Sequence, residues 1–172
     1  MNRNPKSLIL IFALMIFSIS SMSAQFKVQF DARDINNEVV TDSVFSKTKV
    51  TMINVWGTFC GPCIAEMPDL GILNKEYGEK DFQVVGIVID ALNRKGTPDA
   101  KMIETARKIV KQTDADYVHV VPDAKLMNGI LRGIYAVPTT IFVDSNGIVI
   151  GQVYTGSRSL KDWKKIVDGL LR

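Results

Sequence analysis

The sequence contains very little cysteine and histidine, with two cysteines and one histidine in 172 residues. Small exported proteins that depend on disulfides for their stability carry several pairs at wide spacing. A structural zinc site needs four ligands, most of them cysteine or histidine. The chain therefore has too few of these residues for a disulfide scaffold or a zinc site. Its one cysteine pair would also close a very short loop, which restrains the unfolded chain little.

The sequence also has little excess charge, and it shows no internal repeat or low-complexity segment. The formal net charge is +3, and Arg3 and Lys6 supply two of the positive charges, so removal of the N-terminus leaves +1. Proteins that bind nucleic acid or anionic membranes carry a stronger basic excess. The hydrophobic fraction of 47% and the charged fraction of 23% are those of an ordinary globular domain. We therefore expect no nucleic-acid partner.

The longest apolar run is shorter than an ordinary transmembrane helix. It covers residues 8–19, whereas a span needs about 18 or more apolar residues. Two basic residues precede the run and small polar residues follow it, which is the order found in secretory signal peptides. We therefore expect residues 1–24 to be a signal peptide and residues 25–172 to form one exported domain. The alternative is an uncleaved membrane anchor built on residues 8–19.

Alternating and continuous apolar patterns predict the secondary structure of the remaining chain. Strands are expected at residues 26–30, 38–44, 50–56, 82–89, 117–121, 139–143 and 148–153. Helices are expected at residues 60–77, 99–113 and 125–131, and after Ser159. Strands that alternate with helices form parallel pairs, whereas the last two strands form an antiparallel hairpin. The sequence therefore predicts an α/β fold with a mixed central sheet and helices on both faces.

The two cysteines stand in the order Cys60-Gly61-Pro62-Cys63, directly after the predicted strand at residues 50–56. The free N–H groups and the dipole at a helix N-terminus favour a thiolate there. We therefore expect Cys60 to be a nucleophile and Cys63, one turn further on, to resolve the mixed disulfide. Gly61 permits the close turn and Pro62 suits an early helical position, but neither stabilises the thiolate further. The pair should be a reducing couple that needs no metal and no other cofactor.

These residues resemble the thioredoxin superfamily, through W-x-x-x-C-G-P-C after a strand and Val137-Pro138-Thr139 before the terminal hairpin. The segment NVWGTFCGPC at residues 54–63, followed by Glu66 and Pro68, is similar to the exported TlpA/ResA-type thiol–disulfide reductases. The resemblance covers residues 26–172. It implies a thioredoxin-like fold with an N-terminal β extension and a central αβ insert within residues 91–121.

The resemblance also implies roles for several residues. Pro138 matches the cis-proline that faces the two cysteines, and Val137 would offer its backbone to an extended substrate segment. Trp56 and Phe59 match aromatic residues that support the site, although Trp56 could instead be an ordinary core residue. Phe59 stands where tryptophan is more usual in the family.

The sequence departs from the family in its acidic residues. Asn54 stands where cytosolic thioredoxins have a buried aspartate that accepts the proton of the resolving thiol, and an asparagine cannot titrate. Glu66 and Asp90 are the two remaining candidates for this proton. Glu66 could also be a solvated helix residue, and Asp90 could be a simple loop residue. His119, in an apolar strand, is expected to be structural rather than catalytic.

The predicted function is a monomeric thiol–disulfide reductase of the periplasm or cell envelope. Its substrates would be protein disulfides, among them those of apocytochromes c before haem attachment, and a membrane protein would supply its electrons. The alternatives are an oxidase or isomerase on the same fold, a thiol peroxidase, and a chaperone or adaptor. A peroxidase of the peroxiredoxin kind needs threonine three residues before the cysteine, whereas Thr58 lies two before Cys60. An intact CGPC sequence disfavours a chaperone without redox chemistry.

Overall fold

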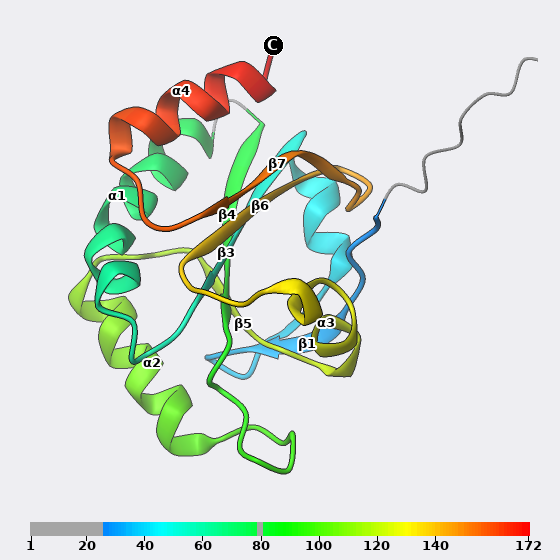
Figure 1. Ribbon diagram of the computed structural model, residues 1–172, viewed down its shortest axis with the longest axis vertical. Coiled ribbons are helices and arrows are strands. Elements are labelled where there is room, and N and C mark those ends of the chain that lie inside the picture. The colour runs from blue at the N-terminus through cyan, green and yellow to red at the C-terminus, as the bar shows by residue number, and fades with distance from the viewer. Residues whose placement is uncertain (1–25, 79–80) are drawn as a thin grey trace, which may run out of the picture.

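A mixed sheet of seven strands lies at the centre of the computed structural model, which describes residues 26–78 and 81–172 (Figure 1). The strand order is β2-β1-β5-β4-β3-β6-β7. The strands are β1 (Asp31–Asp34), β2 (Val39–Thr41), β3 (Val50–Trp56), β4 (Phe82–Val88), β5 (Val118–Val121), β6 (Thr139–Asp144) and β7 (Val149–Thr155). β3, β4 and β5 are parallel, and the remaining neighbours are antiparallel. The predicted mixed sheet is therefore confirmed.

Helices cover both faces of this sheet, as the sequence predicts. They are α1 (Gly61–Tyr77), α2 (Ala100–Gln112), α3 (Ala124–Asn128), α4 (Leu160–Leu170) and the 3-10 helices η2 (Asp42–Lys47) and η4 (Ile130–Gly133). α1, α2 and α4 share two clusters of buried side chains on one face, whereas η2, α3 and η4 pack on the other (Figure 1). The expected signal peptide at residues 1–24 lies outside the described residues. Within residues 26–78 and 81–172, no helix has both the length and the hydrophobicity that a bilayer span requires.

The central strand β3 is buried along its whole length. Ile53 and Val55 face the cluster formed with η2 and α3, whereas Met52 and Trp56 face α1, α2 and α4. Successive residues of a strand point to opposite faces, so a strand that is covered on both faces needs a continuous apolar run. The predicted and observed bounds of this strand agree, and α1 begins five residues after its end.

The first predicted strand, at residues 26–30, is wrong. This segment is extended, but it makes only an isolated bridge between Lys27 and Ile148, and the first strand is β1. The alternating pattern of the segment has another cause, because Val28 and Phe30 pack into the core without forming a full ladder. The expected N-terminal β extension is instead the antiparallel pair of β1 and β2. The second predicted strand, at residues 38–44, is shortened because η2 begins after Thr41.

The segment expected to hold the αβ insert contains α2 and β5. Asp99 caps α2, and its carboxylate accepts hydrogen bonds from the N–H groups of Lys101 and Met102. Ser159 caps α4 in the same way. The predicted helix at residues 125–131 is divided at Gly129 into α3 and η4.

Candidate active site

Cys60 and Cys63 form a disulfide at the N-terminus of α1, with their Cα atoms 5.3 Å apart. Cys60 is the N-cap residue, and the N–H of Cys63 donates to its Sγ over 3.2 Å. Cys60 is 6% exposed and Cys63 is 1% exposed. Cys60 is thus the cysteine that another molecule can approach, and a thiolate at its sulfur would accept the same N–H. Gly61 and Pro62 begin the helix and lie at the surface.

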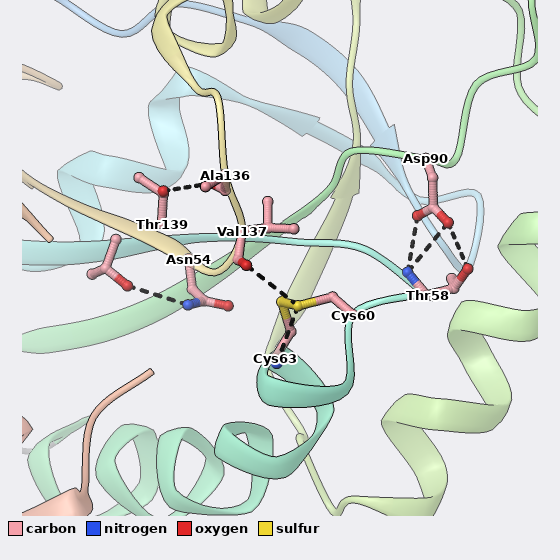
Figure 2. The surroundings of a disulfide bond; sticks show 9 residues. Asn54, Thr58, Cys60, Cys63, Asp90, Ala136, Val137 and Thr139 are labelled. Carbon is pink, nitrogen blue, oxygen red and sulfur yellow. Dashed lines mark hydrogen bonds between the residues drawn. A yellow bond between two sulfur atoms is a disulfide. The ribbon is translucent and has the colours of Figure 1, made fainter. Parts of the chain in front are cut away.

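Val137, which is followed by Pro138, lies opposite the disulfide with its carbonyl oxygen toward Cys60 (Figure 2). Their peptide bond is cis, as the resemblance implies, and the carbonyl oxygen of Val137 lies 3.6 Å from Cys60 Sγ. The loop is held by hydrogen bonds from Thr139 Oγ1 to Ala136 O and from Gly156 N to Pro138 O. Among the described residues, the N–H of Val137 has no hydrogen-bond partner. The N–H of Val137 is therefore free to pair with an incoming chain.

Trp56 packs in the core beneath the two cysteines and does not line the surface of the site. It is completely buried in the same cluster as Cys60 and Cys63. Its Nε1–H donates to Nδ1 of His119 over 3.2 Å, and Nε2 of His119 lies 3.0 Å from Ala115 O. These partners require a neutral ring with its proton on Nε2. Burial lowers the pKa of His119 to about 4, which agrees with a structural and uncharged histidine.

Asn54 lies two residues before Trp56 in β3, and therefore on the same face of the strand, and Figure 2 shows it beside the disulfide. Its Nδ2 donates to Thr140 Oγ1 on β6 over 3.2 Å. The residue is buried and neutral, so it holds β3 and β6 together without taking up a proton.

Glu66 is buried one turn after Cys63, and the expectation of a solvated helix residue is therefore wrong. Its side chain is 4% exposed. Oε1 accepts hydrogen bonds from Arg158 N over 2.7 Å and from Trp163 Nε1 over 2.8 Å. Oε2 is buried and has no partner among the described residues. Burial raises the pKa of Glu66, and the interactions with Arg158, Trp163 and Asn54 oppose this shift only in part.

Asp90 lies in the turn after β4 and on the other side of the site. Its carboxylate accepts hydrogen bonds from the Thr58 N–H over 3.0 and 3.2 Å, and from Thr58 Oγ1 (Figure 2). Figure 2 shows it beyond Thr58, away from Cys63. The structure therefore connects Asp90 to the loop before Cys60 and not to Cys63.

Two aromatic side chains from the segments around Cys60 and Val137 are strongly exposed. Phe59 is 71% exposed and its ring lies against Gly57, where an added Cβ would come within 2.6 Å of Phe59 Cε1. Tyr135 is 95% exposed. Tyr135 was not among the predicted site residues, although it lies two residues before Val137. Trp163 was also missed, because its pattern is that of an ordinary helix core residue.

The chain is similar to known proteins over most of its length. The family model described as Redoxin matches residues 22–167. The thiol-disulfide oxidoreductase ResA of Oceanobacillus iheyensis is 29% identical over 167 residues, which are 89% of this chain and 79% of that protein. The thiol:disulfide interchange protein DsbE of Haemophilus influenzae is 32% identical over 127 residues, which are 74% of this chain and 62% of that protein.

A solved structure has the same fold. It is a thiol:disulfide interchange protein of the thioredoxin family from Chlorobium tepidum, with a TM-score of 0.71 and 22% identity over 86% of this chain and 97% of that one. The thioredoxin-like architecture expected from residues 54–63 and from Val137-Pro138-Thr139 is thus confirmed. Because the family model covers most of its length, the chain belongs to the Redoxin family, as a thiol–disulfide oxidoreductase.

Proposed function

We propose that this protein reduces protein disulfides, with Cys60 as the attacking and Cys63 as the resolving residue. The observation that carries the proposal is the position of Cys60 Sγ. It lies at a helix N-terminus, accepts the Cys63 N–H, belongs to the more exposed of the two cysteines, and lies 3.6 Å from the carbonyl oxygen of Val137. Helix N-termini lower the pKa of a cysteine and increase its thiolate fraction.

The reaction transfers two electrons from the dithiol to the substrate. The Cys60 thiolate attacks one sulfur of the substrate disulfide, so that a mixed disulfide forms and the other substrate sulfur leaves as a thiolate and takes up a proton. Cys63 then loses its proton and attacks Cys60 Sγ. The Cys60–Cys63 disulfide forms, and the second substrate sulfur is released as a thiolate. A dithiol electron donor must reduce the protein again before the next cycle.

Glu66 is the group that we assign to the proton of Cys63. It lies one turn further along the buried face of α1, and its Oε2 is free of hydrogen bonds within the described chain. A proton acceptor works best when its pKa lies near that of its partner, and burial moves the pKa of Glu66 upward, toward that of a thiol. Asp90 is bound to Thr58 and Asn54 cannot titrate, so neither offers this chemistry.

The direction of electron flow follows from what surrounds Cys60. Gly61 and Pro62 carry no charge and no side-chain donor, so the thiolate is stabilised by the helix N-terminus alone. A weakly stabilised thiolate belongs to a reducing couple. We expect a reduction potential of about −270 mV, the value of thioredoxin. A potential of about −120 mV would instead indicate an oxidase.

The proposed place of action is the periplasm or cell envelope, where the expected signal peptide at residues 1–24 would send the protein. Disulfides persist there, so a reductase has substrates. We propose protein disulfides as these substrates, including those of apocytochromes c, and a membrane protein as the electron donor. The proposal rests on the N-terminal sequence pattern and on the chemistry of the site.

Two cysteine variants test the proposal. The mature protein should reduce insulin disulfides with dithiothreitol as the electron source. Cys63→Ser should accumulate a mixed disulfide through Cys60, because the resolving thiol is missing. Cys60→Ser is the matched control and should trap nothing. The proposal is wrong if the native protein leaves insulin intact, or if Cys60→Ser traps as much partner as Cys63→Ser.

A further inference from the structure

Two buried side-chain oxygens between α1 and the sheet have no hydrogen-bond partner within residues 26–78 and 81–172. They are Oε2 of Glu66 and the hydroxyl oxygen of Tyr117. A buried polar group without a partner costs free energy, and nearly all such groups in folded proteins pair with protein atoms or with an ordered water. The two groups are complementary, because a carboxylate oxygen accepts a hydrogen bond and a tyrosine hydroxyl can donate one.

Tyr117, which immediately precedes β5, packs on the same buried face of α1 as Glu66. It contacts the cluster of buried side chains that contains Cys63, and also the cluster that contains Leu70 and Trp163. Cys63 and Leu70 are the buried neighbours of Glu66 one turn before and one turn after it in the helix. Trp163 donates to Glu66 Oε1. Tyr117 therefore lies against the turn of α1 that carries the carboxylate.

The electrostatic interactions of the two groups agree with this placement. Burial and the negative charge of Glu66 raise the pKa of Tyr117, so the hydroxyl keeps its proton. Asn54 lowers the pKa of Glu66 and is a third polar group beside the carboxylate. Arg158 is the cation that acts on Glu66, from the segment after β7. His119, whose ring centroid lies 4.3 Å from that of Tyr117, is uncharged at neutral pH because burial lowers its pKa to about 4.

We propose that one buried water joins the Tyr117 hydroxyl to Oε2 of Glu66, and that Tyr117 is a positioning residue for the proton of Cys63. The hydroxyl donates to the water and the water donates to Oε2, as buried waters do where polar groups without other partners converge. When Cys63 attacks Cys60, its proton passes to Oε2, while Tyr117 retains its own proton. The network holds the carboxylate in its charged form until that transfer. The inference rests on the proposed function, because it concerns the step that resolves the mixed disulfide.

Tyr117→Phe tests the network, because it removes the hydroxyl and keeps the ring in the core. If the hydroxyl had no partner, its removal would leave the stability unchanged or raise it. We expect instead that the melting temperature falls by about 3 °C, since a hydrogen bond is lost. High-resolution crystal structures should show a water within hydrogen-bond distance of both oxygens in the native protein. In the variant, no water should occupy that position in the same way.

The rate of the resolving step at different pH values tests the role of the network. The network stabilises the charged carboxylate, so its loss should raise the pKa of Glu66 and move the pH profile to higher pH. Single-turnover measurements should find the step roughly fivefold slower on the acidic side of the profile, and unchanged at its alkaline plateau. In a Glu66→Gln background, Tyr117→Phe should leave the profile unchanged, because the carboxylate is no longer present.

Tyr77→Phe is the matched control, since the Tyr77 hydroxyl donates to Asp168 at the far end of α1. It should lower the melting temperature and leave the pH profile unchanged. The inference is overturned if no water contacts both oxygens in the native protein, or if Tyr117→Phe is as stable as the native protein. It is also overturned if the two have the same pH profile. If the native protein does not reduce insulin, the proposed function fails, whereas the crystal structures and the melting temperatures still decide whether the network exists.

Discussion

Trp163 donates a hydrogen bond of 2.8 Å from Nε1 to Oε1 of Glu66, although 97 residues separate the two in the sequence. Trp163 lies in α4 and Glu66 lies in α1, one turn after the resolving cysteine. The bond occupies one carboxylate oxygen and leaves the other, Oε2, without a partner among the described residues. Arg158 N donates to the same oxygen, so both of these bonds from the C-terminal segment are made to Oε1.

Glu66→Gln should slow the resolving step while the fold is kept. A glutamine oxygen can still accept the bonds from Trp163 and Arg158, but the amide cannot take up the proton of Cys63. We expect a loss on the order of tenfold or more at pH 7, in line with the loss of a positioned base. Single-turnover measurements should show the mixed disulfide accumulating, and the loss should shrink at high pH, where Cys63 ionises without help.

Glu76→Gln is the control. Glu76 lies in α1, as Glu66 does, but it is at the surface and forms an ion pair with Lys164 of α4. It should leave the rate and its pH profile as they are. Equal pH profiles for Glu66→Gln and the native protein would contradict the assignment of Glu66.

The buried histidine should make the fold sensitive to mild acid. The pKa of His119 is about 4 in the folded protein and 6.5 in its ordinary state, so the unfolded chain binds the proton more tightly. The contribution of the neutral ring to the free energy of unfolding is complete above pH 6.5 and is lost as the pH falls toward 4. The total loss is about 3 kcal/mol. Urea unfolding between pH 7 and pH 4 measures the loss.

His119→Gln should show a smaller decrease of stability over this range, although it is less stable at pH 7. The chain has a single histidine, so NMR of its ring assigns the titration without ambiguity. A ring that titrates near pH 6.5 in the folded protein would show that the prediction is wrong.

Gly86→Ala should separate Trp56 from His119. Gly86 lies in β4, and an added Cβ would lie 2.4 Å from His119 Nδ1 and 3.1 Å from Trp56 Nε1. The extra methyl group must displace the hydrogen bond between the two rings, and overpacking of this kind costs about 1–3 kcal/mol. Thermal unfolding and the tryptophan fluorescence should both change. Gly78→Ala is the control, since its Cβ would meet nothing within 4 Å, and it should not lower the stability.

Asp90→Ala should loosen the loop that leads to Cys60. The change removes the acceptor for both the N–H and the hydroxyl of Thr58, at a cost of about 1–3 kcal/mol in the free energy of unfolding. Insulin reduction should also slow, because Cys60 is no longer held at the end of a fixed loop. Thr58→Val removes only the hydroxyl bond and should have a smaller effect on both measurements. A larger effect of Thr58→Val would show that the backbone bond contributes little.

Local patterns were sufficient for the elements that carry the cysteines. The continuous apolar run of β3 predicts both of its ends correctly, because a strand buried on both faces has no polar positions. The start of α1 at Gly61 follows from Pro62 and from the change of period after Cys60. The same reasoning fails at residues 26–30, because burial of Val28 and Phe30 produces the alternating pattern of a strand without a neighbour to pair with along its length.

The sequence by itself determined the redox pair and most of the order of strands and helices, since these depend on residues that are close together in the chain. The place of Val137-Pro138 opposite the cysteines followed from the resemblance to the thioredoxin superfamily. Only the tertiary structure decided that Glu66 is buried and bound to Trp163, that Asp90 holds Thr58, and that Phe59 and Tyr135 are strongly exposed. The physical reason is the same in each case. The burial and the pKa of a side chain depend on which distant elements pack against it, and a helix or strand pattern carries no record of those partners.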